Sequence, residues 1–471
     1  MSVVSYLKDS RLGTCCASLM LPVKVRLDDS PLAKRLASGA FWSLLASVGS
    51  RSFALLASII MARWLGKAAF GEFGIILSTL DMFGTMAGFG MGLTSTKFVA
   101  ECRGHDREKA GRIIAISSAT AWVFGILAGL GLFMLAHWLA NNVLAAPQLT
   151  SLLRISSVSL LLSAVSGAQM GVLVGFEAFR KIAGVSLVSG LMIFVFRVSG
   201  TLFLDLSGAV YGMIAAQAAG CVVTFAVLRQ VAGESGVPLR YQHCMKELPM
   251  LWTFSLPSVL SSLTVMPVMW ICSAMLVNQP NGYAELGIFT AANQWLTIIL
   301  FAPAIISQAA MPVLSDRIGS GDEDQSAKIV LMLVKISALV LLPVVVIGGL
   351  SKVIMGCYGS GFASGWPVMV ISVVTAGVMA VQTPVAYMFA AKGRMWTWLL
   401  MSAAMGLCFI GLNVWMVQSG ALGMALARFV ATCLQCAWSF AYLFCSLNKP
   451  LVPACADIGM AVLGSERGSS S

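Results

Sequence analysis

Long apolar runs separated by short polar loops make up most of the chain. The runs are about 20–27 residues long, which is the length that a helix needs to cross a hydrocarbon layer of ~30 Å at ~1.5 Å per residue. Strands of a membrane barrel would be about 10 residues long and would alternate apolar and polar side chains. The pattern therefore predicts an all-α integral membrane fold with about twelve transmembrane helices. We expect these spans at residues 37–61, 73–93, 113–139, 152–174, 182–204, 209–228, 251–277, 286–311, 329–350, 368–390, 396–417 and 421–444.

Basic residues in the loops predict the topology. Cytoplasmic loops of membrane proteins are enriched in Lys and Arg. When both termini are placed in the cytoplasm, 22 of the 30 Lys and Arg residues fall on the cytoplasmic side, 3 fall on the opposite side and 5 lie inside spans. Basic and non-basic loops alternate strictly along the chain, and this alternation would be lost if the number of spans were wrong. We therefore expect a multi-pass protein with both termini in the cytoplasm.

The two halves of the chain repeat one another. The motif FGEFGI at residues 70–75 matches YAELGI at residues 283–288, at an offset of 213, and each motif opens the second helix of its half. Because each half has an even number of helices, the repeat is parallel, with a pseudo-twofold axis along the membrane normal. Two such lobes enclose a central cavity. The predicted segments are a cytoplasmic leader at 1–35, an N-terminal six-helix lobe at 36–232, a cytoplasmic linker at 233–249, a C-terminal six-helix lobe at 250–446 and a cytoplasmic tail at 447–471.

Composition agrees with a fold surrounded by lipid. Hydrophobic residues make up 58% of the chain and charged residues 10%, against roughly 25% charged residues in soluble domains. The net charge of +11 does not indicate nucleic acid as a partner, because the Lys and Arg residues lie in short loops without interleaved aromatic residues. Cys433 and Cys436 form a CxxC inside a span, with no further Cys or His nearby, and predict neither a metal site nor a redox site.

Positively charged residues outnumber negatively charged residues inside the predicted spans. An ionisable group at the centre of a spanning helix costs about 2.5–3.5 kcal/mol or more, so such residues usually have a function. Five cations stand against one acid, Asp81. Arg pairs phosphate oxygens with its planar fork and stays charged when buried. The excess of cations therefore favours an anionic cargo; the five are Arg51, Arg154, Arg197, Lys335 and Arg428.

Four of these cations are candidates for substrate binding. Arg51 lies near the middle of its span among small polar residues, which favours a cavity-lining position over a structural hydrogen bond. Arg428, Lys335 and Arg197 lie nearer the ends of their spans, where they would either contact a headgroup or extend to the interface. Arg154 is only one turn from a membrane surface, so we favour an interfacial position for it.

Three further charged residues have two interpretations each. Asp81 would either pair with one of the Arg residues and hold it in place, or carry a coupling proton or sodium ion. Arg63 and Glu72 flank a short periplasmic turn and would act either in a gate or in packing.

At residues 62–74, the stretch ARWLGKAAFGEFG resembles the AR-x-LG-x-x-x-FG-x-F motif of polysaccharide transporters, within the multidrug/oligosaccharidyl-lipid/polysaccharide exporter superfamily. The turn GFEAFRK at 175–181 and the stretch LGIFTAA at 286–292 are also similar to this family. The resemblance covers roughly residues 36–443. It implies two six-helix lobes around a central cavity, and alternating access in the bacterial inner membrane. It also implies translocation of undecaprenyl-pyrophosphate-linked oligosaccharide, from the cytoplasmic to the periplasmic leaflet, for O-antigen, capsule or exopolysaccharide. A polysaccharide polymerase and assembly proteins are then expected partners.

Two other classes of protein stay open as alternatives. The first is an ion-coupled drug or cation antiporter of the same superfamily, although such a protein would be expected to contain more buried Asp or Glu. The second is a membrane-embedded polysaccharide-assembly enzyme, which would need larger loops for sugar chemistry. The sequence contains no GxxxxGK[ST] motif for ATP. We therefore expect no enzyme activity, no catalytic residues and no cofactor, and we leave open a coupling to an H⁺ or Na⁺ gradient.

Overall fold

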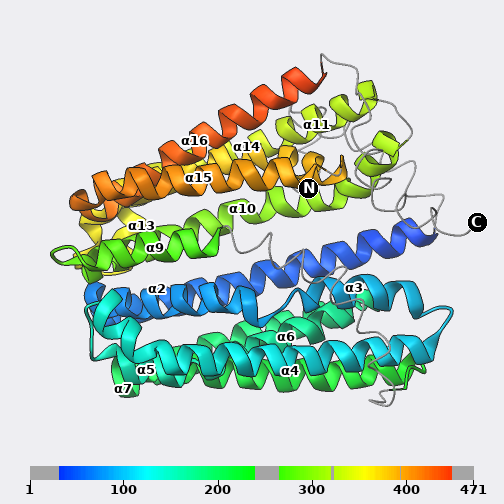
Figure 1. Ribbon diagram of the computed structural model, residues 1–471, viewed down its shortest axis with the longest axis horizontal. Helices are drawn as coiled ribbons and strands as arrows, with labels where there is room; N and C mark the ends of the chain where they lie inside the picture. Colours follow the sequence, from blue (N-terminus) through cyan, green and yellow to red (C-terminus); the bar gives the residue numbers. More distant parts are fainter. Residues whose placement is uncertain (1–30, 239–264, 320–322, 393, 448–471) are drawn as a thin grey trace, which may run out of the picture. The chain divides into compact units, whose positions relative to one another are not determined.

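The computed structural model describes residues 31–238, 265–319, 323–392 and 394–447. Within these residues every regular element is a helix (Figure 1). Eight helices in the described part of the chain are long and apolar enough to cross a membrane. The predicted all-α membrane fold is therefore confirmed. Most of the predicted leader, linker and tail, and the start of the seventh predicted span, lie outside the described residues.

Two of the helices are too long to cross a bilayer once. Helix α2, Pro31–Ala87, has 57 residues, which would extend about 85 Å at 1.5 Å per residue. It is interrupted at Gly66, whose φ of 75° suits a residue without Cβ. Helix α7, Phe179–Glu234, is likewise interrupted at Leu204 and at Asp205. Each of these helices therefore consists of two arms, which correspond to two predicted spans. Because neighbouring spans are merged in this way, the number twelve stays a prediction.

The chain divides into two compact units. The first is Met1–Gly287 with Cys357–Gly361. Its helices α2 and α7 pack along each other, α6 packs against α3, α4 and α7, and α9 packs against α2. The predicted boundaries of the lobes stay a prediction. Besides α2 and α7, the elements that lie wholly in this unit are α3 (Met91–Cys102), α4 (Arg107–Trp138), η1 (Leu139–Val143), α5 (Leu149–Ser156), α6 (Val158–Gly175) and α9 (Met266–Val277).

The second unit consists of Ile288–Gly356 and Phe362–Ser471. Within it α16 packs against α14 and α15, and α14 packs against α11 and α12. Buried amides cross these interfaces, because Gln382 donates to Ser439 Oγ at 3.4 Å and Gln435 donates to Ser402 Oγ at 3.3 Å. The remaining elements are α10 (Gly282–Gly319), α11 (Glu323–Ala338), α12 (Leu341–Gly349), α13 (Ser351–Cys357), η4 (Ser360–Gly365), α14 (Trp366–Ala391), α15 (Met395–Met416), η5 (Val417–Ser419) and α16 (Gly420–Leu447).

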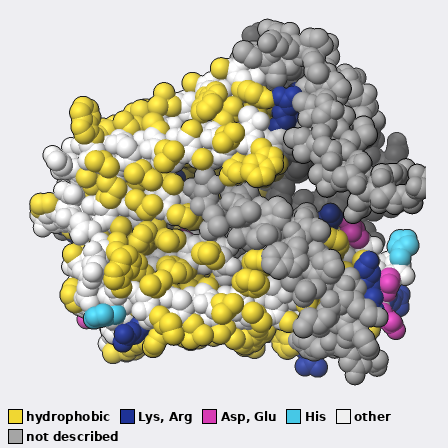
Figure 2. Space-filling view, in the orientation of Figure 1, with side chains coloured by type: hydrophobic (Ala, Val, Ile, Leu, Met, Phe, Trp, Pro, Cys, Tyr) yellow, Lys and Arg dark blue, Asp and Glu magenta, His cyan; other side chains and the backbone are white. Residues whose placement is uncertain are grey.

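Large apolar side chains cover the outer surfaces of the helices. Figure 2 shows hydrophobic side chains over most of the described surface on the visible face, whereas Lys, Arg, Asp and Glu are few and lie toward the ends of the helices. Met134 on α4 is 76% exposed and Trp415 on α15 is 86% exposed. Such exposure would be unfavourable in water and is suited to contact with lipid.

Candidate functional site

A cavity of about 630 Å³ lies inside the first unit. It is bounded by the second arm of α2, by α6 and by both arms of α7, and Met266 at the start of α9 completes the lining. Hydroxyl and amide side chains are frequent on its wall, notably those of Thr85, Ser159, Ser163, Ser166, Ser189, Gln217 and Thr224. Asp81 and Arg197 are the charged residues among those that line it. The cavity therefore brings together two residues that lie far apart in the sequence.

Glycines allow the two arms of α7 to approach closely beside this cavity. A Cβ atom on Gly208 would lie 1.8 Å from the carbonyl oxygen of Gly200, and a Cβ on Gly212 would lie 2.1 Å from that of Phe196. The same Gly212 Cβ would lie 3.0 Å from the Cα atom of Arg197. These contacts leave no room for a side chain. Because Gly212 has no side chain, the backbone of Arg197 on the first arm can lie close to the second arm of α7.

Arg197 holds its charge within the lobe with little direct compensation. Its guanidinium carbon lies 5.7 Å from the centre of the Phe73 ring, a cation–π distance. Its Nε atom is buried and has no hydrogen-bond partner in the described part of the chain. Its backbone carbonyl accepts the Thr201 hydroxyl at 2.7 Å. A buried Nε–H group without an acceptor is costly, so this residue is suited to binding an anion.

Asp81 faces the same cavity from α2. Its charge and that of Arg197 act on each other through space. Neither residue makes a direct ion pair with any residue that the structure describes. The two residues therefore line one cavity without forming an ion pair with each other. Both roles predicted for Asp81, pairing with an Arg and carrying a coupling ion, stay predictions.

The other predicted binding residues lie elsewhere. Arg51, on the first arm of α2, is half-buried and is not among the residues that line the cavity. In the second unit, Arg428 on α16 donates from Nη1 to Asn293 Oδ1 on α10, at 2.6 Å. Lys335, in the last turn of α11, is exposed. Arg154 is exposed on α5, with its guanidinium carbon 5.4 Å from the centre of the Phe133 ring. The structure therefore brings Arg197 and Asp81 to one cavity, and none of the other predicted cations is among the residues that line it.

The two residues predicted at the periplasmic turn differ in their surroundings. Arg63 is exposed. Glu72 accepts a hydrogen bond at Oε1 from Gln148 Nε2, at 3.1 Å. Nearby, the Tyr283 hydroxyl donates to the carbonyl of Leu144 at 2.7 Å. Glu72 therefore belongs to a polar network at this turn, and its role as gate or packing residue stays a prediction.

The repeated motifs meet within the first unit. A Cβ on Gly71 would lie 1.8 Å from the Tyr283 carbonyl oxygen, and a Cβ on Gly287 would lie 2.1 Å from the Lys67 carbonyl oxygen. The FGEFGI motif of the first half therefore packs directly, backbone to backbone, on its YAELGI counterpart. The sequence signalled the likeness of the two motifs but not their contact.

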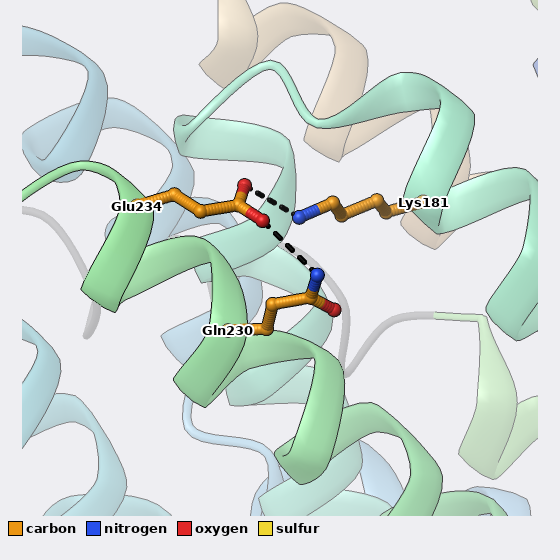
Figure 3. Close-up of polar contacts among 3 residues, drawn as sticks. All are labelled: Lys181, Gln230 and Glu234. Atoms are coloured by element: carbon orange, nitrogen blue, oxygen red, sulfur yellow. Dashed lines mark hydrogen bonds and ion pairs between the residues drawn. The ribbon is translucent and has the colours of Figure 1, made fainter.

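The ends of the α7 arms are joined by a cluster that sequence reasoning did not identify (Figure 3). Lys181 Nζ lies 2.6 Å from Glu234 Oε2, and Gln230 donates to Glu234 Oε1 at 3.0 Å (Figure 3). The hydrogen bond from Lys181 is the largest of the effects that lower the pKa of the Glu234 carboxyl below its ordinary value. A second ion pair joins Arg103 and Glu177 at 2.5 Å. These contacts fasten the helix ends that we predict to be cytoplasmic.

Solved structures of membrane transporters share this fold. An inward-facing multidrug resistance MATE family transporter of the MOP superfamily matches with a TM-score of 0.71 at 14% identity, over 88% of this chain and 100% of that chain. The lipid II flippase MurJ, in an inward closed conformation, matches with a TM-score of 0.67 at 13% identity, over 85% of this chain and 87% of that chain. At these identities the likeness concerns the fold alone, and it supports an all-α multi-pass membrane fold.

Sequence comparison gives the family. Residues 36–317 match the family described as polysaccharide biosynthesis protein, and the chain belongs to this family. The resemblance inferred from the motifs is thereby confirmed.

Two relatives are named for polysaccharide export or transport. The EPS I polysaccharide export inner membrane protein EpsE of Ralstonia nicotianae is 24% identical over 289 residues, which cover 60% of this chain and 64% of that protein. The succinoglycan biosynthesis transport protein ExoT of Rhizobium meliloti is 24% identical over 351 residues, which cover 74% of this chain and 67% of that protein. The match therefore spans slightly less than two thirds of EpsE.

Proposed function

We propose that this protein is a flippase that moves undecaprenyl-pyrophosphate-linked oligosaccharide from the cytoplasmic to the periplasmic leaflet of the bacterial inner membrane. Its product would serve the synthesis of a surface polysaccharide such as O-antigen, capsule or exopolysaccharide. Alternating access of the two lobes would carry the headgroup, and an H⁺ or Na⁺ gradient would be a source of energy. Polysaccharide polymerase and assembly proteins are the partners that this function requires.

The observation that carries the proposal is the cation within the first unit. Arg197 lines a cavity among hydroxyl and amide side chains, with its Nε atom lacking a partner among the described residues. A pyrophosphate group that crosses hydrocarbon needs fixed positive charge, and guanidinium groups supply it with suitable geometry. The family of the chain, and the export and transport functions named for its relatives, support a polysaccharide precursor as the cargo. Arg51, Arg428 and Lys335 are further candidates along the path.

One observation favours a second candidate function. Asp81 places a carboxylate on the cavity wall, and an acid inside a span is what an ion-coupled drug or cation antiporter would use. The unequal number of cations and acids in the spans favours the flippase. The two functions differ in the residue on which transport depends. Loss of Asp81 would abolish efflux by a cation antiporter, whereas loss of Arg197 would abolish transport by a phosphate carrier.

Complementation tests the proposal in cells. The gene is expressed in a strain that lacks the flippase of its polysaccharide pathway, and surface polysaccharide is measured beside the amount of protein in the membrane. We expect the wild-type chain and Arg154→Gln to restore polysaccharide, and Arg197→Gln to reach the membrane without restoring it. If wild-type protein restores no polysaccharide but confers resistance to cationic drugs, the antiporter is the correct interpretation.

A further inference from the structure

Three successive residues of the FGEFGI motif each make a different contact. A Cβ atom on Gly71 would lie 1.8 Å from a carbonyl oxygen of the YAELGI counterpart, so the two backbones touch at this point. Glu72 Oε1 accepts a hydrogen bond, at 3.1 Å, from the amide side chain that precedes α5. The centre of the Phe73 ring lies 5.7 Å from the guanidinium carbon of Arg197. Because successive residues of a helix point about 100° apart, this turn of α2 is fixed on three sides.

Phe73 contacts Arg197 without lining the cavity. On α2 the lining of the cavity begins at Leu77, one turn further along the helix, whereas Arg197 is part of the lining. The Phe73 side chain is buried, at 2% exposure. A molecule in the cavity therefore meets Arg197 and does not meet this ring, so an effect of Phe73 on such a molecule acts through Arg197.

The face of an aromatic ring stabilises a guanidinium in a different way from a hydrogen-bond acceptor. Its negative electrostatic potential attracts a cation that lies over it, which offsets part of the cost of burying the charge. A carboxylate or carbonyl group would occupy N–H groups at the edge of the guanidinium, whereas the ring occupies none of its five donors. The Phe73 ring can therefore hold the Arg197 side chain in place while its donors stay available to other acceptors.

We infer that Phe73 is the positioning residue of Arg197, and that the FGEFGI turn fixes the ring through the contacts of Gly71 and Glu72. The part that Arg197 plays in transport rests on the proposed function, whereas the contact between ring and guanidinium does not. The inference gives the motif a physical purpose: the turn that packs on YAELGI also orients the cation of the cavity.

Phe133 and Arg154 provide a matched control pair. The guanidinium carbon of Arg154 lies 5.4 Å from the centre of the Phe133 ring, close to the 5.7 Å of the Phe73 pair. Phe133 is 47% exposed, and neither residue of the control pair lines the cavity. Fluorination of either ring weakens one cation–π contact with little change in the size of the side chain. A difference between the two pairs therefore reports on the position of Arg197.

The first experiment places fluorinated rings at position 73 of the full-length protein. Mono-, di- and trifluorophenylalanine withdraw progressively more electron density from the ring face and keep its shape, so a role in packing alone would not respond. Translocation of a fluorescent lipid-linked oligosaccharide is measured in proteoliposomes. We expect the rate to fall with each fluorine, about tenfold in all for the trifluoro ring, and to stay at the wild-type value when Phe133 is fluorinated. A wild-type rate with trifluorophenylalanine at position 73 would overturn the positioning role.

Fluorine NMR tests the contact without transport. The resonance of monofluorophenylalanine at position 73 is recorded for the full-length protein in lipid nanodiscs. We expect Arg197→Gln to shift this resonance and Arg154→Gln to leave it unchanged. A label at position 133 should show the opposite pattern. A resonance at position 73 that responds equally to both substitutions, or to neither, would contradict a specific contact with Arg197.

A change at Gly71 tests the role of the turn. Gly71→Ala adds a Cβ atom that would clash with the backbone of the YAELGI motif, whereas a Cβ atom at Gly184 would meet nothing within 4 Å. The shift that Arg197→Gln causes at position 73 should fall to about half or less in the Gly71→Ala background and persist in the Gly184→Ala background. An equal shift in both backgrounds would show that the turn does not hold the ring.

The two kinds of measurement separate this inference from the proposed function. If wild-type vesicles translocate no lipid while the resonance at position 73 responds to Arg197→Gln alone, the flippase is refuted and the ring still positions the guanidinium. If the vesicles translocate lipid and the resonance does not respond, the proposed function stands and the positioning role of Phe73 is overturned.

Discussion

Replacing Gly212 with Ala should push the two arms of α7 apart at Arg197. The added Cβ would lie 2.1 Å from the Phe196 carbonyl oxygen and 2.7 Å from its carbon, whereas ordinary contacts begin at 3.4 Å. Both atoms belong to backbone, so no side-chain rotation can relieve the clash, and the helices must separate by about 1 Å. Overpacking of this kind costs about 1–3 kcal/mol, and sometimes more.

Gly184 offers a control on the same helix. A Cβ atom there would meet nothing within 4 Å, and Ala is favoured over Gly inside a helix by about 1 kcal/mol. Thermal unfolding of the purified protein in nanodiscs compares the two variants. We expect Gly212→Ala to unfold at a temperature several degrees below that of the wild type, and Gly184→Ala at the same temperature or higher. Equal unfolding temperatures for Gly212→Ala and the wild type would refute the close packing of the two arms.

The remaining predictions concern three other contacts. Because Lys181 lowers the pKa of Glu234, this pair stabilises the fold above the ordinary carboxyl pKa, and the effect disappears as the pH falls through the lowered value; Glu234→Gln should remove this part of the pH dependence of thermal unfolding, and an unchanged profile would contradict it. Gly71→Ala should lower the unfolding temperature, since its Cβ would lie 1.8 Å from the Tyr283 carbonyl oxygen; a wild-type temperature would show that the two motifs do not touch. Arg51→Ala and Arg428→Ala should reach the membrane yet fail to restore surface polysaccharide in a flippase-null strain, and full complementation by both would exclude them from the substrate path.

The hydrophobic pattern predicted the fold class because a chain needs a long apolar helix wherever it crosses the lipid bilayer. It also placed the breaks between spans correctly at Gly66 and near Asp205, since short polar turns separate the apolar runs. The likeness of FGEFGI and YAELGI indicated the repeat. These features are local in sequence, or depend on a comparison of two local patterns.

The cavity could not be predicted in the same way. Asp81 and Arg197 face it from different helices, and their proximity depends on how α2 and α7 pack. That packing depends on glycine contacts such as Gly190 on α7 against Ser50 on α2, which apolar periodicity does not show. A partial signal was present in the Ser-rich fourth predicted span, which contains Ser159, Ser163 and Ser166. Several hydroxyls on one spanning helix indicate a polar surface within the lobe.

Direct measurement of lipid translocation tests the central claim. The protein is reconstituted in proteoliposomes that contain a fluorescent undecaprenyl-pyrophosphate-linked oligosaccharide in both leaflets, and an impermeant quencher is added outside. We expect the wild type and Arg154→Gln to expose nearly all of the label, and Arg197→Gln to leave the inner-leaflet half protected. If wild-type vesicles protect as much label as protein-free vesicles, or if Arg197→Gln translocates at the wild-type rate, then Arg197 does not carry a phosphate-bearing lipid across the membrane.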